Sequence, residues 1–265
     1  LRGDDACQGT ATDMRGKQLP ATIDPRAWTI LSHLPWVDTA NVGARDVSAM
    51  PLQAFFNRRQ VVTDVFAPAL TSAHPKLVGG WWSNLASRYG YAFMSRNFGK
   101  VYVMTGKMPK VPRTWHGETQ NTPDADMRFM SVCTAGSPTA STTPDCIYDE
   151  QLAPTVDDSG RYMVVISREA DRPRNATEAC GVAWVEMGNG DGMVSGSSEY
   201  GLVINRHTLV NSAFQHSWFA VATPGTERQA MGDYLPYLLN LKETARFEAL
   251  GCPVDRSQLT AMLPK

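Results

Sequence analysis

Seven short β-type runs between residues 89 and 206 constrain the fold of this chain more than any other feature of its sequence. The runs are YGYAFMS, KVYVMTG, MRFMSVC, DCIYDEQL, RYMVVIS, CGVAWVE and YGLVINR. Most of them alternate β-branched or aromatic residues with other residues, which is typical of strands. Turn-forming groups such as DDSG at 157–160 and GNGDG at 188–192 separate the runs, without long helical crossovers. The sequence therefore predicts a mainly β fold, an antiparallel β-sandwich or open barrel with peripheral N- and C-terminal helices.

The N-terminal part has a helical pattern instead. Asp24 is a capping residue, and Pro25 suits the first turn of a helix, where its missing N–H costs nothing. Apolar residues then fall on one face until Pro35 ends the helix. A second helical stretch is expected at about 52–65. We therefore expect residues 1–80 to form a mostly helical or irregular segment packed on the core.

Helical signals also follow the last β-type run. The segment NSAFQHSWF at 211–219 is expected to form a short helix. Asn240 and Glu243 have the spacing of a capping box, and Gly251 is typical of the position that follows a helix. Residues 81–265 are thus expected to form a β-sandwich domain with a C-terminal helix.

The cysteines indicate an oxidising compartment. None of the five has the CxxC or a similar spacing of a zinc site, so we expect disulfides. Cys133 and Cys146 flank a segment rich in Thr, Ser and Pro, Cys180 with Cys252 is the second expected pair, and Cys7 is free or replaces one partner. Residues 1–20 are polar and small, like the region after a removed export signal. We therefore expect a secreted or periplasmic protein.

Charge and hydropathy exclude two classes of partner. Lys plus Arg total 25 against 26 for Asp plus Glu, and like charges do not form long runs. Nucleic acid normally requires a basic face, so no nucleic-acid partner is expected. No apolar stretch approaches the roughly 20 residues of a membrane-spanning helix, so no membrane span is expected.

The sequence lacks the motifs of the common enzyme families. It contains neither GxSxG, HExxH, GxGxxG nor a phosphate-binding P-loop, and Leu1 takes the place of the N-terminal histidine of a copper monooxygenase. Two adjacent carboxylates, Asp149 and Glu150, lie in a strand-like run, so their side chains are expected on opposite faces and one at most lines a cavity. Asn175-Ala-Thr177 has the pattern of a glycosylation sequon.

Histidines are the strongest candidates for chemistry. His116, His207 and His216 are expected to meet at one rim of the sandwich, where they would hold a metal with an open position. As an alternative to metal ligation, the same three histidines act as general bases, with Arg206 steadying a negative charge and Glu118 supplying a carboxylate. The simpler interpretation is three unrelated histidines in ordinary hydrogen bonds. The sequence names no cofactor.

Aromatic residues cluster where the β region begins. Such residues either form core or stack on sugar and planar ligands, and neighbouring arginines anchor anionic or hydroxylated groups. The candidate ligand-binding residues are Trp81, Trp82, Arg88, Tyr89, Tyr91 and Arg96.

Several of these segments resemble a group of uncharacterised secreted bacterial proteins. They are YGYAFMSRNFGKVYVMTGKMPKVPRTW, DMRFMSVCTAG with DCIYDEQL, SGRYMVVISREADRPRNATEACGVAWVEMG, GLVINRHTL and MGDYLP, within about 88–236. More remotely, their order is similar to that in the tandem domain-of-unknown-function proteins of the twelve-fifty-four and twelve-fourteen type, which are β-sandwich proteins. The resemblance implies the fold and export but no reaction, and residues up to about 80 depart from it.

Two hypotheses of function follow. The first is a protein that binds a small organic or glycan ligand in an aromatic-lined cavity of the sandwich. The alternative is an exported enzyme, metal-dependent or not, that uses the three histidines on such a molecule. A structural surface protein is a third reading, favoured only by the cysteines.

Overall fold

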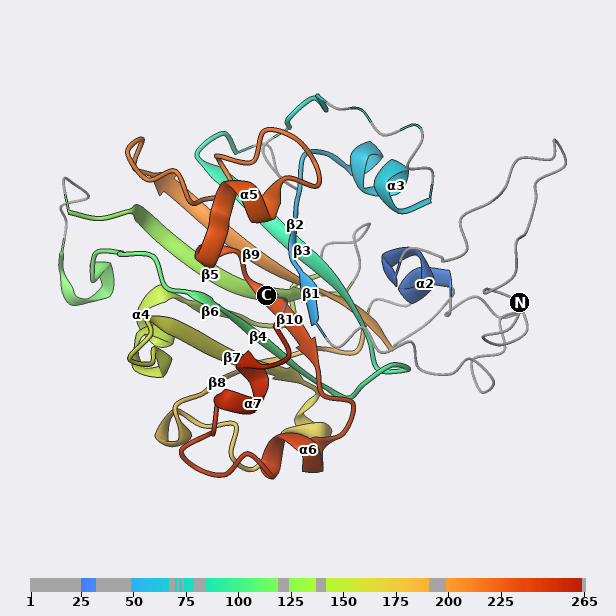
Figure 1. The fold of residues 1–265 in the computed structure, drawn as a ribbon, viewed down its shortest axis with the longest axis vertical. Coiled ribbons are helices and arrows are strands. Elements are labelled where there is room, and N and C mark those ends of the chain that lie inside the picture. Colours follow the sequence, from blue (N-terminus) through green and yellow to red (C-terminus); the bar gives the residue numbers. More distant parts are fainter. Residues whose placement is uncertain are drawn as a thin grey trace, which may run out of the picture.

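Two five-stranded sheets form the protein in this computed structural model, which describes residues 25–31, 49–66, 70, 72, 74–78, 84–118, 124–136, 142–190 and 199–263. Figure 1 shows the sheets as two layers, with short helices around them. The strands outweigh the helices, so the prediction of a mainly β sandwich is confirmed. Among the described residues, no helix is long and apolar enough to cross a membrane.

The first sheet has the order β1-β10-β4-β7-β8. Its strands are antiparallel neighbours except β7 and β8, which run parallel. The parallel pair is connected through two 3-10 turns, η4 (Glu169–Asp171) and η5 (Glu178–Cys180). The strand bounds are Ala49–Pro51 for β1, Val101–Lys107 for β4, Arg161–Ser167 for β7, Ala183–Glu186 for β8 and Tyr237–Asn240 for β10.

The second sheet is fully antiparallel, in the order β2-β3-β9-β5-β6. Its long strand β9 lies between β3 and β5, pairing for example Asn205 with both Gly90 and Val132. The strand bounds are Gln53–Ala54 for β2, Ser87–Ser95 for β3, Met127–Ala135 for β5, Cys146–Tyr148 for β6 and Tyr200–Val210 for β9.

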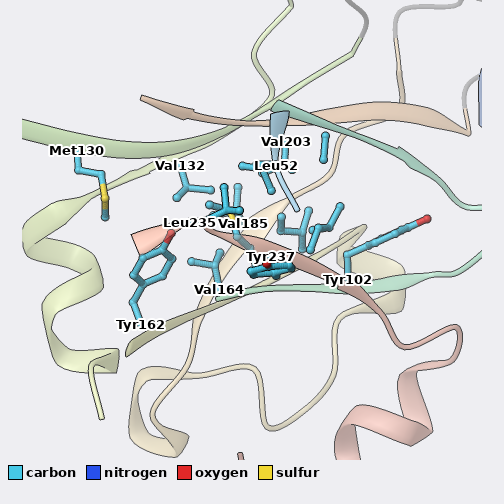
Figure 2. Packing of buried hydrophobic residues seen from close by; sticks show 14 of the residues in the cluster. Leu52, Tyr102, Met130, Val132, Tyr162, Val164, Val185, Val203, Leu235 and Tyr237 are labelled. Atoms are coloured by element: carbon cyan, nitrogen blue, oxygen red, sulfur yellow. The ribbon is translucent and has the colours of Figure 1, made fainter. Parts of the chain in front are cut away.

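The main core lies between the two sheets. Alternate residues of each strand point inward, so Val132 and Val203 of one sheet face Val164 and Val185 of the other (Figure 2). All four are fully buried. Period-two burial of β-branched residues is the pattern that the sequence predicted for these strands.

The outer face of the second sheet carries another core. Tyr89, Tyr91 and Phe93 of β3 pack there with Leu202 of β9 and with Ala27 of helix α2 (Pro25–Leu31). The predicted helix start at Pro25 is confirmed. This face is therefore a packed layer, because α2 and Phe55 cover the tyrosine rings.

The predicted helix at 52–65 is wrong over its first part. Only Arg58–Phe66 is helical, as α3, and the preceding residues form β1 and β2. Leu52 is fully buried between these strands, which join one sheet each. Leu52 and Phe56 face the main core and Phe55 faces the second core, which is strand-like alternation rather than a helical stripe.

The C-terminal predictions hold only in part. Asn240 ends β10 instead of capping a helix, and its side chain accepts a hydrogen bond from Lys242 N–H and donates to Phe98 O. Helix α6 (Thr244–Glu248) begins after Glu243, and Gly251 follows it with φ 81°, as expected for a helix end. The predicted helix at 211–219 is absent, and turns replace it.

Several short elements complete the chain. They are η2 (Thr114–His116), α4 (Asp149–Leu152), η3 (Ala153–Thr155), α5 (Glu227–Met231), η6 (Gly232–Tyr234) and α7 (Ser257–Thr260). Helix α4 occupies the second half of the run DCIYDEQL, which the sequence predicted as a strand. Tyr148 is its N-cap residue, and Gln151 Oε1 accepts the Tyr148 N–H at 3.1 Å.

Both predicted disulfides are confirmed. Cys133 and Cys146 face each other across β5 and β6, and the bond crosslinks paired strands. Cys180 of η5 is joined to Cys252, which ties the C-terminal segment to the first sheet. Cys7 lies outside the described residues.

Candidate ligand-binding groove

A groove of about 500 Å³ opens on the side of the sandwich where both sheets end. This side carries β6, the edge of the second sheet, and β8, the edge of the first. At one end the edges are joined, because Asp145 accepts a hydrogen bond from Glu186 N–H (3.1 Å) and Thr134 donates to Glu186 O (2.6 Å). The groove lies farther along, between α4 (at the left of Figure 1), η2, η5 and β8.

Three aromatic side chains line this edge groove. Trp115 in η2 is 79% exposed, and its ring lies 6.2 Å from that of Tyr148 at an angle of 44°. Trp184 on β8 is held from two sides, since its Nε1 donates to Ser167 Oγ (3.0 Å) and the Arg172 guanidinium lies 4.3 Å from the ring centroid. The groove therefore presents aromatic rings to solvent, and that of Trp184 is held in place.

The backbone of β8 adds polar groups to the same wall. In this strand Glu186 N–H points away from β7, toward Asp145, whereas Met187 N–H donates to Ser167 O of β7. By the alternation of a strand, the N–H and C=O of Trp184 also point away from β7. Among the described residues neither group has a hydrogen-bond partner, which leaves both for a ligand.

A histidine and a carboxylate form a hydrogen-bonded pair at the rim. Glu150 accepts Trp115 N–H at Oε1 (2.5 Å), and its Oε2 pairs with His116 Nδ1. Desolvation by itself raises the pKa of Glu150, but the hydrogen bonds from Trp115 and His116 and the nearby Arg113 bring it below its ordinary value. The carboxylate is thus held ionised beside the imidazole.

The neighbouring carboxylate has a structural role. Asp149 is buried and accepts Met130 N–H (2.9 Å) and Glu150 N–H (2.8 Å). Burial raises its pKa, against these two hydrogen bonds. Asp149 and Glu150 do point in different directions, but because they begin α4 and not because they alternate along a strand.

The structure does not bring the three candidate metal ligands together. His116 is at the edge groove, His207 is buried against Trp218 (5.8 Å between rings), and His216 stacks on Tyr234 (5.5 Å). No group of three or more His, Cys, Asp or Glu side chains within the described part of the chain is placed to hold a metal ion. The sequence could not show that the three histidines lie apart, because it does not determine which face of the sandwich each side chain takes.

The other candidate catalytic residues have local partners. Arg206 lies on the outer face of the second sheet, 5.1 Å from the centroid of the Tyr89 ring. The Glu118 carboxylate accepts Arg113 N–H (2.8 Å), within its own turn. Neither residue lines the edge groove.

The aromatic cluster predicted to bind a ligand is core where the structure describes it. Tyr89 and Tyr91 are buried in the second core, and Trp81 and Trp82 lie outside the described residues. Arg88 packs over the Phe219 ring at 4.8 Å.

Two further polar side chains are also engaged. Arg96 bridges Asp171 and Glu199, both at 2.6 Å. The sequon residue Asn175 is buried and donates to Phe247 O (3.1 Å) and Gly251 O (2.8 Å), so a glycan there would require this contact to open.

Sequence reasoning missed all three groove aromatics. Tyr148 and Trp184 lie in strand-like runs that predict core. Trp115 carried a usable signal. It follows Pro109 and Pro112 in a segment without hydrophobic periodicity, where an indole has no expected core partner.

Comparison with known proteins does not assign a family. No protein-family model matches the sequence, and no curated protein matches it significantly. Two crystal structures are weakly similar. The first is an uncharacterized protein from Burkholderia cenocepacia, with a TM-score of 0.37 and 15% identity over 89% of this chain and 43% of that one. The second is a protein from Vibrio parahaemolyticus, with a TM-score of 0.31 and 14% identity over 58% of this chain and 31% of that one. This chain spans less than half the length of either. Similarity this low identifies neither a shared fold nor a shared function.

Proposed function

We propose that the chain binds a small organic molecule or a glycan in the edge groove between β6 and β8. The observation that carries the proposal is the 79% exposed indole of Trp115, which stands beside the ring of Tyr148 at the rim. Neighbouring aromatic rings that are exposed along a groove are typical of ligand-binding sites. The apolar face of a sugar ring, or a planar organic molecule, would stack on these rings.

The polar groups of the groove favour a ligand with hydroxyl or similar groups. Arg172 and Glu178 supply one charge of each sign, and Gln151 supplies a neutral amide. With the free N–H and C=O of Trp184, the wall offers donors and acceptors at fixed positions. A volume of about 500 Å³ is within the common range for ligand sites.

The proposed location is outside the cytoplasm, in the periplasm or in the medium. The two disulfides support it, because such bonds form and persist in oxidising compartments. The resemblance to uncharacterised secreted bacterial proteins, and more remotely to the tandem domain-of-unknown-function proteins, points the same way and remains part of the proposal.

A glycan array followed by calorimetric titration tests the binding function. We expect Trp115→Ala to weaken binding of the array ligand at least about 10-fold, equivalent to ~1.4 kcal/mol, because the stacking surface is lost. Leu85→Ala is the matched control, since Leu85 is equally exposed (76%) but does not line the groove. Equal affinity of wild type and Trp115→Ala would refute the proposal.

A small-molecule screen covers ligands that an array lacks. Binding to the native state stabilises it by RT ln(1 + L/Kd), where L is the ligand concentration, so the thermal midpoint rises as L exceeds Kd. We expect aromatic or sugar-like compounds to raise the midpoint of the wild type and of Leu85→Ala, but not that of Trp115→Ala.

A further inference from the structure

We infer that His116 and Glu150 form a general-base pair that activates water against an acyl ester carried by the groove ligand. This inference rests on the proposed function, because the groove has to hold the ligand beside the imidazole. It adds a reaction to binding and gives the ligand a chemical class, an esterified sugar or another small ester.

The hydrogen bonds around Glu150 fix the orientation of the imidazole. Both carboxylate oxygens are engaged, one by Trp115 N–H and the other by His116 Nδ1. An ionised carboxylate only accepts hydrogen bonds, so Nδ1 carries a proton, and in the neutral form of the imidazole the lone pair is on Nε2. Nε2 is on the side of the ring away from Glu150. Since the ring lines the groove and is 56% exposed, this lone pair is accessible to a bound ligand.

The pair is anchored in the second sheet rather than in a free loop. Glu150 N–H donates to Asp149, and Asp149 accepts Met130 N–H of β5. A base whose orienting carboxylate is itself held by hydrogen bonds keeps its geometry during a reaction. The same order of groups, carboxylate then Nδ1–H with Nε2 free, orients the histidine of catalytic triads.

The other histidines that the structure describes lack this arrangement. His74 and His216 are exposed, and His207 is buried with an Nδ1 that has no hydrogen bond. None of these three has a carboxylate partner within the described part of the chain. His116 is thus distinguished by its geometry and not by its residue type alone.

The inferred reaction balances with water as the only co-reactant. Nε2 takes a proton from water while the water oxygen forms a bond to the ester carbonyl carbon. The bond from that carbon to the alkoxy oxygen then breaks, and Nε2 returns the proton to the leaving alkoxide. The products are a carboxylic acid and an alcohol, without any change of oxidation state.

Diethyl pyrocarbonate measures the reactivity of each imidazole. The unprotonated nitrogen attacks a carbonyl carbon of the reagent and becomes ethoxycarbonylated, with release of ethanol and carbon dioxide. We expect His116 to react at least about 10-fold faster than the exposed His216, as followed by peptide mass spectrometry. Glu150→Gln should remove this advantage, because the amide N–H₂ donates to Nδ1 and moves the ring proton to Nε2.

A second assay uses 4-nitrophenyl acetate as an ester probe. We expect the wild type to release 4-nitrophenolate at least about 10-fold faster than His116→Gln and Glu150→Gln, whereas His216→Gln keeps the wild-type rate. Circular dichroism and thermal melting identify any variant that fails to fold. Equal ester rates in wild type and His116→Gln, with equal reagent reactivity of His116 and His216, would overturn the inference.

The outcomes separate this inference from the proposed binding function. If array or screen ligands bind the wild type and Trp115→Ala alike, the binding site is wrong, and the reactivity of His116 is still decided by the two chemical assays. If a ligand binds in the groove but the chemical assays show no special reactivity, binding stands and the general base is rejected.

Discussion

Replacing His207 by leucine should make the protein more resistant to acid. His207 is 3% exposed, its Nδ1 is buried without a hydrogen bond, and its cross-strand partners Arg88 and Met130 offer no negative charge. Burial alone lowers its pKa from 6.5 to about 3. The folded protein therefore keeps this imidazole neutral over a pH range in which the unfolded chain protonates it.

The sign and size of the effect follow from proton linkage. Because the folded pKa lies below the unfolded one, His207 costs no stability above about pH 7, and the penalty grows as the pH falls from about 6.5 toward 3. At pH 5 the unfolded form gains about 2 kcal/mol from protonation, and this value depends on the unfolded pKa and hardly on the folded one.

Urea unfolding at pH 7.5 and pH 5, followed by tryptophan fluorescence, measures this difference. Between the two pH values, wild type should lose about 2 kcal/mol more unfolding free energy than His207→Leu, which keeps a similar side-chain volume. His216→Gln, at an exposed site, is the control and should lose as much as the wild type. Equal losses in wild type and His207→Leu, or an NMR titration of folded His207 near pH 6, would refute the reasoning.

Two further perturbations test the packing and the crosslinks. Gly90→Ala should cost about 3 kcal/mol in unfolding free energy, because a Cβ there would lie 2.0 Å from Cζ2 of Trp218. A cost below about 1 kcal/mol would contradict this and mean that the indole moves freely. Replacing the Cys180–Cys252 pair by serines should cost about 4 kcal/mol and replacing Cys133–Cys146 about 3 kcal/mol, since the bonds close chain separations of 72 and 13 residues. The same unfolding assay measures both, and the reverse order would contradict the chain-entropy account.

The groove depends on contacts between segments that are distant in the chain. Trp115 and His116 come from η2, Glu150 from α4 and Trp184 from β8. Glu150 was identifiable as a carboxylate that could face a cavity, and His116 as a candidate base. Their pairing was not predictable, because it requires a loop after β4 to lie over the helix after β6.

The sequence alone indicated the seven strands from β3 to β9 and the disulfides, but not the short strands β1, β2 and β10. Alternating β-branched residues have one low-energy arrangement, half-buried strands, and the cysteines of a chain without zinc spacings pair as disulfides. Tertiary structure alone decided which faces became core. Tyr91 and Trp115 are both aromatic residues, yet packing against α2 and α3 buries the first in the second core, whereas nothing within the described residues covers the second. Burial is a property of the assembled layers, so a residue type and its spacing cannot specify it.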